Sequence, residues 1–177
     1  MNHIQKNTKI LISSDEINLA VNKVALELNT DYKEKDPIIL CVVKGAIIFT
    51  GQLLPKLDFK MELDYIHATR YHGQEGKEIQ WKYKPDINFN GRNILLIDDI
   101  LDIGITLREI TAFCFEKGAE SVKSVVLLEK NIKRPKSSVQ NADYSGIKID
   151  NHFVFGYGLD LDGYWRNTKD IFYVEDN

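Results

Sequence analysis

The sequence has little cysteine and no long apolar run, and each shortage excludes a class of protein. Its two cysteines, Cys41 and Cys114, lie in apolar stretches, which favours buried free thiols over a disulfide framework or a metal site. No apolar run approaches the roughly 20 residues that a membrane-spanning helix needs. Residues 1–9 are polar and lack the apolar core of a signal peptide. We therefore expect a cytoplasmic protein that does not enter a membrane.

Excess charge of one sign is also lacking. The formal net charge of −3 gives no broad attraction to nucleic acid or to an anionic membrane, so neither is an expected partner. What the chain does have is 44% hydrophobic residues, which is enough for a real core. Its 177 residues contain no repeat, no low-complexity tract and no linker, so we expect residues 1–177 to form a single domain.

Strand-like and helix-like segments alternate along the middle of the chain. Ser13 and Glu16 have the spacing of a capping box, which predicts the start of a helix. Apolar periodicity predicts helices at residues 14–29, 46–54 and 106–117, and strands at 38–43, 60–69, 78–83, 93–97, 121–128, 146–149, 152–157 and 171–174. This alternation predicts an α/β fold with a mainly parallel sheet, in which the loops after the strands gather at one edge.

One stretch, residues 94–106, combines a buried strand with acids and a glycine turn. Asp98, Asp99 and Asp102 follow four apolar residues, and Gly104 and Thr106 come just where a helix begins. A helix N-terminus offers unpaired N–H groups to an anion. Carboxylates at such a position often only cap the helix, but three of them repel one another, which indicates a ligand or cation that neutralises them.

Several phosphate chemistries do not fit this stretch. The Gly-x-Gly-x-x-Gly fingerprint of dinucleotide-binding folds and the lysine of a P-loop are absent. The Asp98-Asp99-Ile100 order is not the Asp-x-Asp of aspartyl-phosphate phosphatases, and a receiver domain would carry its acid pair on an early strand. A remaining reading is that residues 102–106 wrap a phosphate monoester while Asp98 and Asp99 bind the hydroxyls of its ribose.

The order of an apolar strand, two acids, two apolar residues and Asp-x-Gly-x-Thr resembles the phosphoribosyl-diphosphate signature of type I phosphoribosyltransferases. Three further stretches resemble motifs of the hypoxanthine-guanine phosphoribosyltransferases: residues 40–45, residues 127–130, and residues 153–160 with 164–166. The similarity runs from about residue 10 to residue 175 in order and spacing.

The resemblance implies a type I phosphoribosyltransferase fold: a mainly parallel central sheet flanked by helices, with a core at about residues 13–130 and a small hood built from residues 1–12 and 131–177. It implies transfer of 5-phosphoribosyl from phosphoribosyl diphosphate (PRPP) to N9 of hypoxanthine or guanine, which yields IMP or GMP and pyrophosphate in purine salvage. Mg²⁺ is the implied cofactor. A homodimer or homotetramer is the implied assembly.

The same resemblance assigns roles to individual residues. Asp102 is implied to be the catalytic group that handles the proton at purine N7. PRPP, its 5′-phosphate and pyrophosphate are implied to contact Lys44, Gly45, Asp98, Asp99, Ile103, Gly104, Ile105, Thr106 and Arg166. The purine is implied to contact Lys130, Phe153 and Val154, with Lys130 donating to O6, while Mg²⁺ is implied to bind Asp98, Asp99 and Asp160. A mobile lid is implied at Arg70 and Tyr71, and a cis peptide is often found in the loop at Lys44 and Gly45.

Three positions depart from the family pattern. Ile103 stands where a small hydroxyl residue is common, Ile105 replaces a polar residue, and Arg70 replaces a serine before Tyr71. Because Ile103 has no side-chain donor for the phosphate, we expect an active enzyme with weakened PRPP binding. Two alternatives remain open at this point: a non-catalytic, nucleotide-sensing regulator on the same fold, and a phosphoribosyltransferase for another base such as xanthine or adenine.

Overall fold

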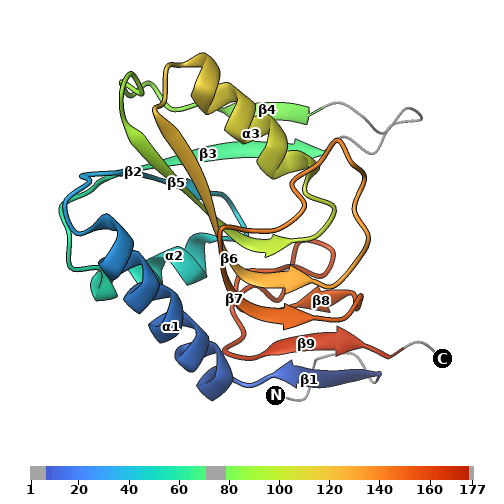
Figure 1. Cartoon of the computed structure of the whole chain (residues 1–177). Helices are drawn as coiled ribbons and strands as arrows, with labels where there is room; N and C mark the ends of the chain where they lie inside the picture. Colours follow the sequence, from blue (N-terminus) through green and yellow to red (C-terminus); the bar gives the residue numbers. More distant parts are fainter. Residues whose placement is uncertain (1–6, 71–78, 176–177) are drawn as a thin grey trace.

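The structure is a computed structural model that describes residues 7–70 and 79–175 (Figure 1). Helices α1, α2 and α3 span Ser14–Tyr32, Ile47–Leu53 and Ile105–Glu116, and a short 3₁₀ helix spans Leu54–Lys56. The strands are β1 Thr8–Ile12, β2 Ile38–Val42, β3 Glu62–Arg70, β4 Ile79–Tyr83, β5 Asn93–Leu101, β6 Ser121–Lys130, β7 Tyr144–Ile149, β8 Val154–Phe155 and β9 Ile171–Val174.

The central sheet has six strands in the order β4-β3-β2-β5-β6-β7. All neighbours in it pair in parallel except β3 and β4, which pair antiparallel. The chain builds outward from β2 in one direction through β3 and in the other through β5. The strand order therefore reverses between β2 and β5, and the crevice outside the carboxyl ends of two such strands is where open α/β sheets bind ligands.

Helices cover both faces of this sheet. One apolar cluster joins α1 and α2 to one face, and the other joins α3 to the opposite face (Figure 1). Successive residues of β5 alternate between the clusters: Leu95 and Ile97 belong to the first, Ile94 and Leu96 to the second. The continuous apolar runs of the sequence thus mark strands covered on both sides, as predicted, and the mainly parallel α/β fold is confirmed.

Helix α1 begins at the predicted capping box and runs past its predicted end. The Glu16 N–H donates to Ser13 Oγ, and the Glu16 carboxylate accepts the Ser13 N–H at 2.8 Å. The helix continues to Tyr32, beyond residue 29, because the buried Tyr32 ring packs against Phe59 and Tyr144. The free energy gained by packing this aromatic ring outweighs the tendency of the preceding polar residues to end the helix.

Strand β5 is longer than the sequence predicts, and it contains the first two aspartates of the acidic stretch. It continues past residue 97 to Leu101, with Asp98 opposite Val126 and Leu101 opposite Glu129 on β6. The neighbouring strand supplies hydrogen-bond partners for this backbone, so the acids enter the sheet despite their low strand propensity. Strand β6 is correspondingly longer and ends at Lys130 instead of residue 128.

A separate three-stranded antiparallel sheet has the order β1-β9-β8. Strand β1 was not predicted, because residues 1–12 look peripheral in the sequence; it pairs with β9, with Thr8 opposite Val174. The predicted strand at 152–157 shrinks to β8, since Gly156 and Tyr157 take positive φ angles. The Ser14 N–H at the start of α1 donates to Asp170 Oδ1 at 2.8 Å, which ties this sheet to the core.

The remaining boundaries move by a residue or two, as helix and strand ends commonly do. Helix α3 begins at Ile105 instead of residue 106, and Gly118, predicted at its carboxyl end, has a φ of 89° directly after Lys117, the residue that caps the helix. Across residues 7–70 and 79–175, none of the helices is both long and apolar enough to cross a membrane.

Candidate active site

A cavity of about 300 Å³ opens at the carboxyl ends of β2 and β5, where the strand order reverses. It brings together most of the residues that the sequence predicts to bind PRPP and magnesium. The predicted residues in its lining are Gly45, Asp98, Asp99, Asp102, Ile103, Gly104, Ile105, Thr106, Asp160 and Arg166. The sheet topology therefore gathers segments that are more than a hundred residues apart in the chain.

The turn from β5 into α3 is shaped to hold an anion. Gly104 caps the helix with a φ of 80°, a left-handed conformation that favours glycine. A Cβ on Gly104 would also lie 2.5 Å from the carbonyl oxygen of Val139. Because the N–H groups of the first helical turn have no intrahelical partner, those of Ile105 and Thr106 are donors at the cavity wall.

Asp98, which is buried, and Asp99, which is partly buried, form an acidic pair in the lining of the cavity. The Asp99 N–H donates to Asp98 Oδ1 at 2.9 Å. Burial, followed by the negative charge of Asp99, raises the pKa of the Asp98 carboxyl well above its ordinary value. Burial also raises the pKa of Asp99, although accepted hydrogen bonds and the positive charge of Arg166 oppose the rise. A cation or a shared proton is therefore stabilised at this pair.

Two glycines allow neighbouring loops to pack closely beside the acidic pair. A Cβ on Gly45 would lie 1.8 Å from Asp99 Oδ2, and one on Gly158 would lie 2.1 Å from the Gly45 carbonyl oxygen. The loop after β2, the end of β5 and the loop after β8 thus approach at backbone distance. The side chain of Lys44 is exposed, and the cis peptide of this loop joins Val43 to Lys44.

Arg166 and Asp160 are held together at the rim of the cavity. Arg166 Nη2 donates to Asp160 Oδ1, and Arg166 Nη1 donates to the Gly158 carbonyl oxygen at 2.6 Å. The other Asp160 oxygen accepts the Gly163 N–H at 2.8 Å. Each oxygen of Asp160 therefore already accepts one hydrogen bond, and the positive charge of the adjacent Arg166 guanidinium opposes a metal ion there.

The predicted purine-binding residues lie beside this cavity, outside its lining. Lys130 Nζ lies 3.3 Å from Asp102 Oδ1, and its side chain is 11% exposed. Val154 is buried in β8, while the neighbouring Phe153 is 58% exposed and presents a ring to solvent. The ion pair between Lys130, the last residue of β6, and Asp102, the residue after β5, connects the ends of these two strands.

The predicted lid and the predicted metal site are only partly within the described residues. Tyr71 falls outside the described residues, and Arg70 is the last residue of β3 before that gap. Within residues 7–70 and 79–175, no three His, Cys, Asp or Glu side chains gather closely enough to hold a metal ion by themselves. Mg²⁺ usually keeps several waters and binds one or two carboxylates together with substrate phosphates, so the Asp98–Asp99 pair fits a shared site.

Sequence reasoning missed two residues that shape the site. Gly158 belongs to a recognised motif, yet its close approach to Gly45 depends on a loop packing that no local pattern encodes. Arg134 lies in the segment between β6 and β7, which looks merely polar and irregular. Its side chain is buried and donates to four backbone carbonyls, and no apolar periodicity in the sequence signals that placement.

Comparisons with known proteins agree with this geometry. Residues 9–162 match the phosphoribosyl transferase domain family. The chain is 37% identical to a hypoxanthine-guanine phosphoribosyltransferase of Streptococcus pneumoniae, over 92% of this chain and 91% of that protein. It is 31% identical to a hypoxanthine-guanine-xanthine phosphoribosyltransferase of Tritrichomonas foetus, over 92% and 89%.

A solved structure agrees in fold as well. A hypoxanthine-guanine phosphoribosyltransferase of Bacillus anthracis superimposes with a TM-score of 0.88 and 27% identity, covering 94% of this chain and 98% of that one. The paired aspartates within β5, the glycine turn into α3 and the similarity over nearly the whole length all support the same family. The chain therefore belongs to the phosphoribosyltransferase family and, within it, to the hypoxanthine-guanine phosphoribosyltransferases.

Proposed function

We propose that this protein transfers the 5-phosphoribosyl group of PRPP to N9 of a 6-oxopurine, giving IMP or GMP and pyrophosphate in purine salvage. The observation that carries the proposal is the cavity at the switch point, in which an acidic pair and a helix N-terminus face one space. This arrangement suits a ligand that carries hydroxyls and a phosphate. The names of the related proteins support the same reaction.

The 5′-phosphate binds at the turn of residues 102–106. Backbone N–H groups of the first turn of α3 and the Thr106 hydroxyl donate to its oxygens. The ribose hydroxyls lie over Asp98 and Asp99, which are ready-made acceptors at the floor of the cavity. Ile103 and Ile105 contribute backbone donors only, so we propose that the phosphate is held less tightly than it would be with a hydroxyl at residue 103.

We propose that Asp98 and Asp99 would hold a Mg²⁺ ion that the diphosphate of PRPP also binds. The raised pKa values of Asp98 and Asp99 support this, because a divalent cation offsets the cost of burying two neighbouring carboxylates. When bound, Mg²⁺ neutralises charge on the departing pyrophosphate. Lys44 and the backbone of Gly45 face the same diphosphate. Arg166 turns from Asp160 toward pyrophosphate, which frees Asp160 for a second Mg²⁺.

The purine is proposed to lie between Lys130 and Phe153. Lys130 is a donor with no acceptor, so it favours an oxygen at position 6 over the amino group of adenine. Phe153 stacks on the ring, and the Val154 backbone contacts its edge. Asp102 sits within reach of Lys130 and handles the proton at N7 during bond formation at N9. A lid at Arg70 and Tyr71 excludes water from C1′.

The single domain of residues 1–177 is proposed to divide into a core at about 13–130 and a hood from 1–12 and 131–177. The β1-β9-β8 sheet supports this division, since it joins both terminal segments and carries Val154. We also propose a homodimer or homotetramer. Ile47, Leu63 and Tyr65 are large apolar side chains that are 45–54% exposed on α2 and β3, and association would cover them.

An assay with separated substrates tests the proposed reaction. The protein is incubated with PRPP, Mg²⁺ and hypoxanthine, guanine, xanthine or adenine, and both nucleotide and pyrophosphate are measured. We expect product with 6-oxopurines, little with adenine, and none after Mg²⁺ is chelated. The absence of product with every base would overturn the proposal and favour the non-catalytic regulator, for which the comparisons give no support. Sedimentation of the wild type and of Leu63→Lys tests the proposed assembly.

A further inference from the structure

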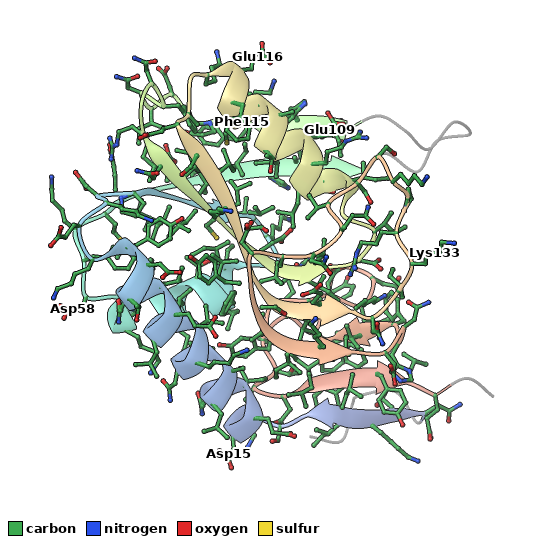
Figure 2. The ribbon with its side chains drawn as sticks, in the orientation of Figure 1. Asp15, Asp58, Glu109, Phe115, Glu116 and Lys133 are labelled. Atoms are coloured by element: carbon green, nitrogen blue, oxygen red, sulfur yellow. The ribbon has the colours of Figure 1, made fainter. Side chains whose placement is uncertain are left out.

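Arg134 is a buried cation whose partners in the described part of the chain are backbone carbonyls. It lies in the segment of residues 131–143, between β6 and β7, and only 8% of it is exposed. Figure 2 shows the adjacent Lys133 pointing away from the same segment. Arg134 donates from Nε to Asp102 O at 2.6 Å, from Nη2 to Leu101 O at 2.9 Å and Lys130 O at 2.6 Å, and from Nη1 to Gln140 O at 2.9 Å.

Three of these four acceptors lie at the ends of two neighbouring strands, and the fourth, Gln140, belongs to the same segment as Arg134. Leu101 ends β5 and Asp102 follows it, while Lys130 ends β6. One planar guanidinium therefore fixes the backbone at both residues of the Asp102–Lys130 ion pair. The rigid fork of an arginine can satisfy several acceptors in one plane, which the single nitrogen of a lysine cannot do.

The rest of the segment also rests on the phosphate-binding turn. The Val139 N–H donates to the Gly104 carbonyl at 3.3 Å, and Arg108 Nη1 donates to the Ser137 carbonyl at 2.5 Å. Gly104 has no room for a Cβ because the Val139 carbonyl oxygen is so close. The segment of residues 131–143 thus packs against the turn, and the hydrogen bonds of Arg134 connect this segment to the ends of β5 and β6.

We propose that Arg134 is a positioning residue that sets the separation of Asp102 and Lys130 and the path of the turn at residues 102–106. It acts through backbone carbonyls and does not contact the substrates. The proposal rests on the reaction proposed above for its kinetic consequences, and its structural consequence can be measured without any substrate. Arg134 would then govern how the proton-handling group and the donor to O6 are placed along the edge of the purine that carries N7 and O6.

Arg134→Lys keeps the charge and removes the fork, so it is the decisive variant, and Arg134→Gln removes both. We expect kcat to fall about 10- to 100-fold, since small misplacements of reacting groups have effects of that order. The KM for the purine should rise several-fold. The lower kcat and the higher KM should both appear at temperatures well below the melting temperature of the variant. Without substrate, hydrogen exchange should quicken in peptides that cover residues 101–106 and 130–134.

Two variants serve as controls. Arg92→Met removes an arginine at the opposite end of β5 that also donates to a backbone carbonyl, that of Asp36 at 3.1 Å, so it destabilises the sheet away from the site. Lys133→Met removes the adjacent exposed cation. Both should keep kcat within about twofold of the wild type and leave exchange at residues 101–106 unchanged.

The outcomes separate the two proposals. If the wild type makes no nucleotide, the proposed reaction fails, and the exchange measurement still decides the role of Arg134. Wild-type kinetics in Arg134→Lys, or unchanged exchange at residues 101–106, would overturn the positioning role. So would an Arg92→Met variant that loses turnover and exchange protection to the same degree, because the effect would then be one of general stability.

Discussion

Lys130 Nζ lies 3.3 Å from Asp102 Oδ1, so the two groups proposed to contact the neighbouring O6 and N7 atoms of the purine are paired with each other in this structure. Lys130 is mostly buried, whereas Asp102 is 38% exposed at its side chain. The pair holds each group near its working position and keeps the partly buried ammonium neutralised. In the proposed complex, this contact is exchanged for one of Lys130 with O6 and one of Asp102 with N7.

Replacing Lys130 by Met should weaken binding of 6-oxopurines. A hydrogen bond to a charged group contributes roughly 1.5–3 kcal/mol, which corresponds to a KM for hypoxanthine about 10- to 100-fold higher. The KM for PRPP should change little. Steady-state kinetics with each substrate varied in turn measures both constants, and an equal rise in the two would mean that the variant disturbs the whole site.

Replacing Asp102 by Asn should lower turnover and spare PRPP. General acid–base catalysis typically contributes about 10²- to 10⁴-fold, so kcat should fall within that range. Calorimetric titration with PRPP and Mg²⁺ should give an unchanged affinity, because the backbone of the turn is retained. An equal loss of turnover and of affinity would make Asp102 a residue that only positions the turn.

Replacing Gly45 by Ala should displace Asp99. The added Cβ would lie 1.8 Å from Asp99 Oδ2, so either the loop or the carboxylate has to move. We expect turnover to fall about 10- to 100-fold and stability to fall by about 1–3 kcal/mol. Gly51→Ala is the control, since its Cβ meets nothing within 4 Å and a helical Gly→Ala change adds roughly 0.5–1 kcal/mol.

Replacing Ile103 by Thr should lower the KM for PRPP. The new hydroxyl adds one donor beside the 5′-phosphate, and a charged hydrogen bond of this kind is worth roughly 1.5–3 kcal/mol, or about tenfold and more in affinity. Ile103→Val supplies the same branched shape without the hydroxyl and should leave the constant unchanged. A KM for PRPP that stays level or rises in the Thr variant refutes the idea.

The stability of the unliganded protein should fall as the pH rises above the ordinary range of a carboxyl pKa. Burial beside Asp99 raises the pKa of Asp98, so the folded state holds a proton that the unfolded chain releases. This proton stabilises the folded state fully at a pH below the pKa of Asp98 in the unfolded chain. The stabilisation is lost as the pH rises through the pKa of Asp98 in the folded protein. Asp98→Asn keeps a neutral side chain and should remove this loss.

Urea unfolding from pH 4 to pH 8 measures the effect. The gap in unfolding free energy between Asp98→Asn and the wild type should widen with pH in favour of the variant. Asp58→Asn is the control, because Asp58 is exposed at the edge of the molecule (Figure 2) and is not among the residues that line the cavity. A constant gap across the range would show that Asp98 titrates as an ordinary carboxyl.

The sequence alone was sufficient for the core sheet and for the turn from β5 into α3. Their apolar runs, helical periodicity and glycine punctuation are local signals, and each agreed with the final packing. The capping box of α1 is another such signal. What local patterns missed was the extension of β5 through Asp98 and Asp99, because that depends on pairing with β6.

Two other features could not be predicted because their partners are distant in the chain. Strand β1 is a short mixed segment, and it becomes a strand only beside β9, whose residues lie at the other end of the sequence. Arg134 resembles the solvated Lys133 next to it, and only the three-dimensional convergence of four carbonyls distinguishes them. Neither the pairing of β1 with β9 nor the hydrogen bonds of Arg134 produce a periodic pattern or a motif in the sequence.

The pairing of β1 with β9 also fixes an order of assembly during synthesis. Residues 8–12 emerge early but have no partner strand until residues 171–174 have left the ribosome. β8, which carries the proposed purine-contacting Val154, pairs with the same late strand. The parallel sheet is complete after residue 149, so the acidic pair and the turn at residues 102–106 have their neighbouring strands before β9 is synthesised. Asp160 and Arg166 come later in the chain, so the cavity that they line is completed last.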